Sequence, residues 1–157
     1  MKKLTGLGKY IALAESCTAG LTADFIARVP GACRVLWGSF VVYTPDAKIK
    51  LLGVPEELLE RHGPVSRSVA LAMADGALEK SGAAWSVSVT GLAGPGGDAS
   101  GIPTGTVWIG VAGVHGKSRA KMYLFEGKRN EVREAAAAAA LEELLEQIRR
   151  DIDRVEV

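Results

Sequence analysis

A short turn between an apolar segment and a helical segment is the feature that most constrains the fold of this chain. Residues 10–13 are apolar and few enough to form a buried strand, and residues 21–29 carry apolar side chains at helical spacing. The heptapeptide Ala14–Gly20 therefore joins a strand to a helix. Such a turn directs unpaired backbone N–H groups and the positive end of a helix dipole toward one place. Ser16 stands there as a nucleophile, an anion ligand or a helix cap.

Strand-like and helix-like segments alternate along the rest of the chain, with no repeat or linker that divides it. This alternation favours a sheet covered by helices, and a hairpin at the last two strands makes the sheet mixed. We expect one domain over residues 1–157, an α/β/α three-layer sandwich around a mixed, mostly parallel sheet of about five strands. The expected strands are 9–14, 33–43 (one strand, or two joined at Gly38), 85–90, 106–112 and 117–125, and the expected helices are 19–29, one beginning at Pro45, 56–61, 66–80 and 130–155.

Two side-chain patterns predict which faces are buried. Trp37 lies in an almost continuously apolar segment and is expected in the core. The segment 117–125 alternates in the manner of an edge strand. Its expected arrangement has Arg119 and Lys121 pointing outward and Ala120, Met122 and Leu124 pointing inward.

Composition excludes several classes of protein. A net charge of +1 argues against nucleic acid as the main partner, because phosphate-driven binding needs a concentrated basic surface. No signal peptide is visible, and no segment approaches the run of about 20 apolar residues that a membrane span requires. Two cysteines, Cys17 and Cys33, suit a reducing cytoplasm. With only His62 and His115 and no Cys/His pairs at ligand spacing, we expect no metal site.

Two further features could contact an anion. The glycine-rich stretch Gly91–Gly105 follows a strand and lacks the Gly-Lys-Ser/Thr ending of a P-loop. It is either an exposed crossover or a backbone cradle for an oxyanion or phosphate. Arg129 and Arg133 stand at the start of the last helix, where the dipole disfavours cations. Their position indicates a nearby anion or, as the favoured interpretation, surface ion pairs.

A second strand exit lies at Tyr43. Thr44 can cap a helix and Pro45 fits its first position, so a helix begins there and Lys48 falls in its first turns. The dipole at that end disfavours an ammonium group, which predicts a lowered pKa for Lys48.

Four blocks of sequence, taken in order, resemble the CinA C-terminal domain family. They are residues 14–18 (AESCT), 43–48 (YTPDAK), 91–95 (GLAGP) and 103–108 (PTGTVW), and the likeness runs from about Lys9 to about Leu145. Stand-alone members of this family are nicotinamide-nucleotide amidases, which deamidate nicotinamide mononucleotide to nicotinate mononucleotide and ammonia in pyridine-nucleotide recycling. The resemblance implies an α/β/α domain similar to the anticodon-binding domain of tRNA synthetases, and a reaction that needs no metal or organic cofactor.

The resemblance also assigns residues by position. Ser16 matches the nucleophile, and Tyr43 and Lys48 match its activating pair, which would replace the histidine of a Ser-His-Asp arrangement. Backbone donors at 18–20 or around 91–94 would hold the oxyanion, and the phosphate would lie on the glycine-rich loop, on a helix N-terminus or against Arg129. The implied substrate-binding residues are Thr18, Ala19, Gly20, Thr90, Gly91, Ala93, Gly94, Thr104, Gly105 and Arg129.

The chain departs from the family pattern at two places. Family members usually carry a helix before the first strand, and here only about eight residues precede it, so one flank is bare or covered by a partner subunit. The family motif often ends Gly-Gly where this chain has Ala19 and Gly20, which bears on how closely a substrate approaches the helix. The short N-terminus and the apolar strand near Trp37 favour a homodimer or a higher homo-oligomer.

Other hypotheses stay open on the sequence alone. Cys17 is a second candidate nucleophile, although a cysteine without a nearby histidine is more often a small buried residue. The chain could be a non-catalytic module that binds a nucleotide or phosphate, or an amidase for another small amide. The expected partner is the substrate nicotinamide mononucleotide, and we expect binding to neither nucleic acid nor a membrane. The expected location is the cytoplasm.

Overall fold

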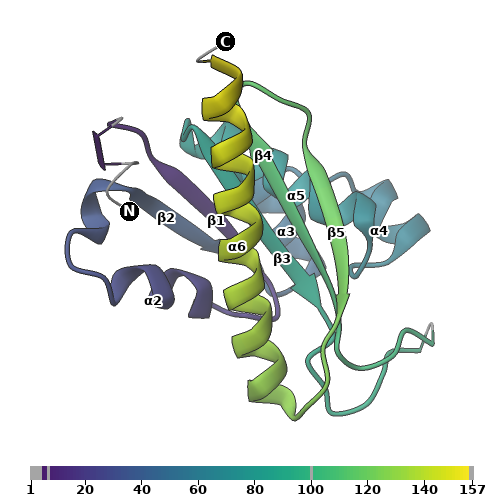
Figure 1. Cartoon of the computed structure of the whole chain (residues 1–157). Helices are drawn as coiled ribbons and strands as arrows, with labels where there is room; N and C mark the ends of the chain where they lie inside the picture. Colours follow the sequence, from purple (N-terminus) through teal and green to yellow (C-terminus); the bar gives the residue numbers. More distant parts are fainter. Residues whose placement is uncertain (1–4, 7, 100, 156–157) are drawn as a thin grey trace.

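The computed structural model of the protein describes residues 5, 6, 8–99 and 101–155. The first strands alternate with helices, three helices and then three strands follow in succession, and one long helix comes last (Figure 1). The elements are β1 (Ile11–Glu15), α2 (Leu21–Ala27), the 3₁₀ turn η1 (Ala32–Arg34), β2 (Leu36–Val41), α3 (Pro45–Leu52), α4 (Glu56–His62), α5 (Arg67–Ser81), β3 (Trp85–Gly91), β4 (Thr106–Gly113), β5 (Arg119–Leu124) and α6 (Arg129–Val155).

The five strands found in the described residues form one sheet in the order β2-β1-β3-β4-β5. β1 pairs in parallel with both β2 and β3, whereas β4 runs antiparallel to β3 and β5. Every strand except β4 therefore runs in the same direction. This confirms the expected mixed, mostly parallel sheet, with a single strand rather than two in the segment 33–43.

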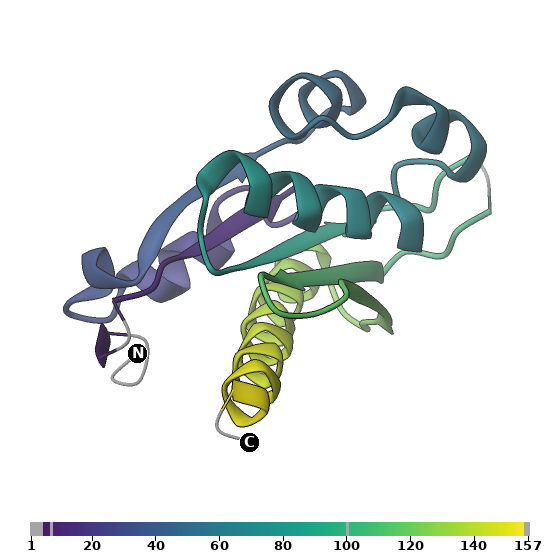
Figure 2. The same ribbon diagram turned by 90° about the horizontal axis from the view of Figure 1, so that it is seen from above.

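Helices cover both faces of the sheet and complete the three layers (Figure 2). α2 and α6 pack on one face around Leu13, Val87 and Ile109, and α5 packs on the other face around Met73. The serines of β3 let α5 approach closely, because Ser86 and Ser88 donate hydrogen bonds to backbone carbonyl groups of that helix. None of the helices in the described part of the chain has the length and apolarity that crossing a membrane requires.

The helix starts follow the predicted caps. Thr44 Oγ1 accepts a hydrogen bond of 3.2 Å from Ala47 N at the start of α3, and Pro45 takes the first helical position. Ser66 Oγ likewise accepts from Val69 N at the start of α5. These caps fix where α3 begins, and hence how far Lys48 lies from the end of β2.

Trp37 is 47% exposed, so its predicted place in the core is wrong. The register of β2 against β1 shifts at this point, with Ile11 opposite Leu36 and Ala12 opposite Gly38. Trp37 is the extra residue of this bulge, and its ring stacks on Phe40 at the edge of the sheet.

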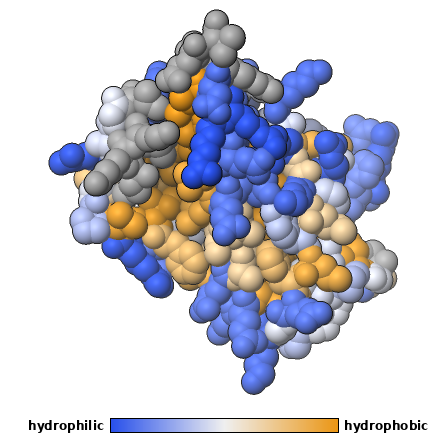
Figure 3. Space-filling view, viewed as in Figure 1, coloured by the Kyte–Doolittle hydropathy of each residue, from blue (hydrophilic) through white to orange (hydrophobic). Residues whose placement is uncertain are grey.

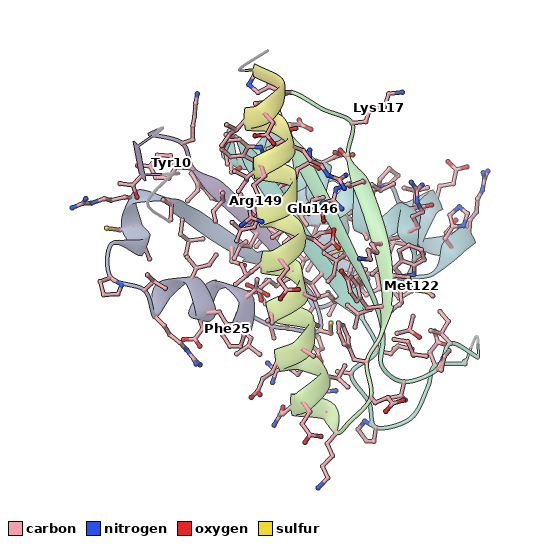
Figure 4. All side chains as sticks on the ribbon, in the orientation of Figure 1. Tyr10, Phe25, Lys117, Met122, Glu146 and Arg149 are labelled. Carbon is pink, nitrogen blue, oxygen red and sulfur yellow. The ribbon has the colours of Figure 1, made fainter. Side chains whose placement is uncertain are left out.

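The predicted faces of β5 are also reversed. Arg119 and Lys121 bind Glu143 of α6, so the charged face of the strand packs against the helix. Met122, labelled in Figure 4, is 54% exposed and Leu124 is 62% exposed. The reversal arises because a buried carboxylate on α6 provides a partner for both cations.

An exposed apolar groove of about 150 Å³ lies between α2 and α6, where Figure 3 shows apolar side chains gathered. The expectation of a bare flank before β1 concerns residues 1–8, of which 1–4 and 7 lie outside the described residues, whereas Thr5 and Gly6 are helical. The groove is lined by Ile11, Phe25, Ile26, Val29, Leu141, Leu144, Leu145 and Ile148.

Candidate active site

A cavity of about 350 Å³ opens at the carboxyl ends of β1, β2 and β3. Parallel strands place the residues that follow them at one edge of the sheet, where α/β proteins commonly bind ligands. The structure brings most of the predicted site residues to this cavity. Those in its wall are Ser16, Tyr43, Lys48, Thr90, Gly91, Ala93, Gly94 and Arg129, together with Cys17 and the glycine-rich residues up to Gly97.

Ser16 and Lys48 are in direct contact. Lys48 Nζ donates a hydrogen bond of 3.0 Å to Ser16 Oγ and a second of 3.0 Å to the carbonyl oxygen of Val42. The backbone N–H of Ser16 donates to the carbonyl oxygen of Val89, which ties the serine to β3. Both side chains are buried, so this pair lies away from bulk water.

Burial is the main cause of a lowered pKa at Lys48. The lysine is 1% exposed, and desolvation lowers its pKa from 10.5 to about 8, while the nearby Cys17 thiol opposes the shift. The direction agrees with the sequence prediction, but the dominant cause is desolvation rather than the helix dipole. A lysine with this pKa is partly neutral at moderately alkaline pH and can accept a proton from a hydroxyl.

Tyr43 stands at the rim of the cavity and is 53% exposed. Its hydroxyl accepts a hydrogen bond of 2.8 Å from Arg129 Nη2, and Arg129 Nη1 donates to the carbonyl oxygen of Gly94. Within the described residues, Tyr43 makes no hydrogen bond to Ser16 or Lys48. The Ser16–Lys48 contact thus forms without the tyrosine, which is joined to the arginine instead.

The predicted surface ion pairs of Arg129 and Arg133 are wrong. Arg133 donates to the carbonyl oxygens of Cys17 and Thr18, at 3.0 and 2.9 Å. Across the described part of the chain, neither arginine forms an ion pair. Both arginines stand at this end of α6 because they donate hydrogen bonds to backbone carbonyl groups, Arg133 to the turn after β1 and Arg129 to the glycine-rich loop.

The interpretation of Ser16 as a helix cap is also wrong, because α2 begins at Leu21 and its N-cap is Gly20, which has no side chain. Glu15 provides the cap instead. Its carboxylate accepts hydrogen bonds from the backbone N–H groups of Gly20, Thr22 and Ala23 at 3.0–3.1 Å. The positive end of α2 therefore meets Glu15 rather than the cavity.

Glu15 is the residue that sequence reasoning missed. It is fully buried, and Ser39 Oγ on β2 donates a further hydrogen bond of 2.8 Å to its carboxylate. A signal was present in the sequence, since an acidic residue ends an otherwise apolar strand directly before the turn. A buried carboxylate needs partners, and the nearest unpaired donors are the N–H groups of the following helix.

The turn residues predicted to bind substrate lie outside the cavity wall. Thr18 is fully buried, and Ala19 is exposed. The N–H groups of Ala19 and Gly20 already donate to the Ser16 carbonyl and to Glu15, so neither is available to an oxyanion.

Thr104 and Gly105 also lie outside the cavity wall. Gly105 has φ +90°, and an added Cβ would lie 2.0 Å from the carbonyl oxygen of Phe125. Its N–H donates to Leu92 and its carbonyl accepts from Phe125, so this glycine joins the loop to the end of β5. Thr90 does line the cavity, but its hydroxyl donates to the carbonyl oxygen of Pro64.

Charge in the cavity is positive. Lys48 and Arg129 are the cationic residues of its wall, and no aspartate or glutamate is among the described residues that line it. Burial raises the pKa of the Cys17 thiol to about 11, which keeps it protonated and disfavours it as the nucleophile. The described residues contain no group of three or more His, Cys, Asp or Glu side chains arranged to hold a metal ion.

Comparisons with known proteins agree on one family. A family model described as the CinA C-terminal domain matches residues 1–148. A CinA-like protein of Anaeromyxobacter sp. (strain K) is 47% identical over 139 residues, which cover 88% of this chain and 34% of that protein. A CinA-like protein of Akkermansia muciniphila is 46% identical over 140 residues, 89% of this chain and 34% of that protein. The chain thus spans about a third of the length of these curated relatives.

Solved structures give the same result. The competence/damage inducible protein CihA from Agrobacterium tumefaciens is 41% identical with a TM-score of 0.87, covering 92% of this chain and 88% of that one. A CinA superfamily protein, KP700603, from Klebsiella pneumoniae 700603 is 29% identical with a TM-score of 0.90, covering 95% of this chain and 92% of that one.

Proposed function

The chain belongs to the CinA C-terminal domain family, and we propose that it is an amidohydrolase that converts nicotinamide mononucleotide to nicotinate mononucleotide and ammonia. The observation that carries the proposal is the buried hydrogen bond of 3.0 Å between Lys48 Nζ and Ser16 Oγ in the cavity wall. A serine is a weak nucleophile unless a base lies within hydrogen-bond distance, and a lysine with a lowered pKa is such a base.

In the first half-reaction, the neutral amine of Lys48 takes the proton of Ser16 as Oγ attacks the carboxamide carbon. The carbonyl group of Val42 accepts a hydrogen bond from the same amine and fixes its orientation. The tetrahedral intermediate then collapses, and the Lys48 ammonium returns the proton to the departing nitrogen, which leaves as ammonia. The C–N bond is broken and a nicotinyl ester of Ser16 remains.

In the second half-reaction, Lys48 takes a proton from water, which attacks the ester and releases nicotinate mononucleotide with the regenerated serine. Both half-reactions develop negative charge on the carbonyl oxygen. Since the N–H groups of Ala19 and Gly20 are occupied, we assign this charge to backbone donors of Ala93 and Gly94, which line the cavity. Their N–H groups make no hydrogen bond within the described residues, and one such donor is worth about 3 kcal/mol in catalysis.

The cavity suits an anionic substrate. The described residues of its wall include Lys48 and Arg129 but no carboxylate, and its volume of about 350 Å³ fits a small ligand. Arg129 already bridges the Tyr43 hydroxyl and the carbonyl oxygen of Gly94, so it stands where a phosphate would meet a guanidinium and the glycine-rich loop together. We propose that Arg129 recognises the phosphate and that Tyr43 orients the arginine.

Ammonia release from nicotinamide mononucleotide, nicotinamide riboside and nicotinamide tests the proposal directly. The mononucleotide should be the best substrate, Ser16→Ala should abolish release, and Cys17→Ala should retain it. Arg129→Met should raise KM for the mononucleotide and leave that for the riboside unchanged. Equal rates on all three amides would indicate a different small-amide substrate, and binding without turnover would indicate a non-catalytic module.

Tyr43→Phe separates the two roles open to the tyrosine. If Tyr43 relays the proton, Tyr43→Phe should lower kcat as much as a substitution of Lys48 does. A tyrosine that orients Arg129 raises KM for the mononucleotide while kcat stays within about threefold. The geometry favours the second result, because the Tyr43 hydroxyl contacts Arg129.

A further inference from the structure

The residue that precedes Ser16 connects three segments of the fold. Glu15 Oε2 accepts from Gly20 N and Thr22 N, both at 3.0 Å, and Oε1 accepts from Ala23 N at 3.1 Å and Ser39 Oγ at 2.8 Å. The carboxylate is therefore shared by the end of β1, the first turn of α2 and the middle of β2. Glu15 is fully buried and forms no ion pair among the described residues, so these hydrogen bonds hold its carboxylate in place.

Ser16 lies between these anchors. The turn 16–20 directly follows Glu15 and ends at Gly20, whose N–H donates a hydrogen bond back to the carboxylate of Glu15. Arg133 holds the same turn from the other side through the carbonyl groups of Cys17 and Thr18. The position of Ser16 Oγ is thus determined by contacts at both ends of a closed turn.

Glu15 also connects to the base through the backbone. Its carbonyl oxygen accepts a hydrogen bond of 2.8 Å from Val42 N, and the Val42 carbonyl in turn accepts from Lys48 Nζ. One residue therefore contacts both the turn that carries the hydroxyl and the strand end that orients the amine. A displacement of about 1 Å between reacting groups can lower a rate about 10²-fold, so such control of position matters.

We propose that Glu15 is a positioning residue, whose buried carboxylate closes the turn at Ser16 and holds the serine hydroxyl against the amine of Lys48. The inference rests on the proposed function only for the role of Ser16 as nucleophile. The competing explanation is that Glu15 merely caps α2 and contributes stability, with no effect on the Ser16–Lys48 contact.

The protonation of Lys48 distinguishes these explanations without any substrate. If Glu15 holds the turn, Glu15→Gln lets water reach the amine, and the pKa of Lys48 rises from about 8 toward 10.5. The loss of the Glu15 charge by itself would lower the pKa of Lys48, because it would make the ammonium form less favourable. Each carboxylate oxygen of Glu15 accepts two hydrogen bonds. In either orientation of the glutamine amide, its NH₂ group stands where one of these oxygens stood and cannot accept them.

The experiment is an NMR titration of Lys48 in the wild-type protein, Glu15→Gln and Glu143→Gln. Glu143 is a matched control, because it is also a buried and hydrogen-bonded glutamate but lies between α6 and β5. We expect the pKa of Lys48 to rise by at least one unit in Glu15→Gln and to stay unchanged in Glu143→Gln. Both variants should lose thermal stability. An unchanged or lower pKa of Lys48 in folded Glu15→Gln would overturn the proposal.

If Glu15→Gln does not fold, Glu15→Asp carries the same test, because it keeps the charge but is one methylene too short to reach all four donors. Activity provides a second readout, in which kcat on the mononucleotide falls about 10²-fold with KM within about threefold. If the wild-type protein releases no ammonia from any amide, the proposed function fails. The titration would still report whether Glu15 controls the Ser16–Lys48 contact.

Discussion

Lys48 Nζ reaches Ser16 Oγ at 3.0 Å across 32 positions of sequence. The contact follows from the topology, since β1 and β2 are parallel neighbours and their carboxyl ends lie side by side. Ser16 is the first residue after β1, and Lys48 lies in the first turns of the helix that follows β2. The α3 N-cap at Thr44 then sets the distance between the strand end and the lysine.

The pH dependence of ammonia release should follow Lys48. The base is active when neutral, so kcat/KM should rise about tenfold per pH unit at acidic and neutral pH and level off above about 8. Lys48→Arg should lose at least 10²-fold in kcat, because a guanidinium does not deprotonate in this range. A pH profile that is flat between 6 and 9 would contradict this assignment of the base.

Lys48 should also destabilise the fold at neutral pH. A pKa lowered from 10.5 to about 8 corresponds to about 3 kcal/mol of unfavourable burial, fully present below pH 8 and relieved between pH 8 and 10.5. Lys48→Met should therefore raise the free energy of unfolding by about 1–3 kcal/mol at pH 7, since lost hydrogen bonds offset part of the gain. Chemical denaturation at pH 7 and 10 measures the difference, which should shrink at the higher pH.

Glu143 should act in the opposite sense. Burial raises its pKa, but hydrogen bonds from Tyr123, Arg119 and Lys121 outweigh that effect and lower it from 4.5 to about 2. Its charge thus stabilises the fold above pH 4.5, and the contribution is lost as the pH falls toward 2. Glu143→Gln should lower the free energy of unfolding by about 2–3 kcal/mol at pH 7 and by less at pH 3. An equal loss at both pH values would indicate packing rather than charge.

The two cysteines should differ in reactivity. Cys33 is exposed, whereas burial raises the pKa of Cys17 to about 11. Because the thiolate is the reactive form, iodoacetamide at pH 8 should alkylate Cys33 and leave Cys17 unmodified until the protein is unfolded. Mass spectrometry of peptides after timed labelling gives both rates. Similar rates at the two positions would show that the Cys17 thiol is more acidic and more accessible than its burial indicates.

The sequence predicted the elements and much of the site because both follow from local patterns. Periodicity and caps located the helices, and the alternation of elements predicted the mixed sheet. The resemblance to the CinA C-terminal domain family assigned Ser16, Tyr43 and Lys48 to one site, and all three line the cavity at the edge of the sheet where the parallel strands end.

What the sequence did not reveal depends on partners that are distant along the chain. The reversed faces of β5 require Glu143 on α6, and an alternating pattern does not say which face a helix will cover. Trp37 is exposed because the pairing of β2 with β1 contains a bulge, where the register shifts. The cap by Glu15 was missed because cap patterns place the acceptor at the helix start, whereas here it lies five residues before Gly20.

Ala19 should be a site of backbone strain rather than of substrate contact. It has φ +49°, a left-handed conformation that an alanine adopts at a penalty of about 1 kcal/mol or more, and it lies outside the cavity wall. Ala19→Gly should therefore stabilise the protein by about 0.5–1 kcal/mol and leave kcat and KM unchanged. The matched control is Ala138→Gly, at an exposed position inside α6, which should destabilise it by about 1 kcal/mol. A changed KM in Ala19→Gly would show instead that the residue lies within reach of the substrate.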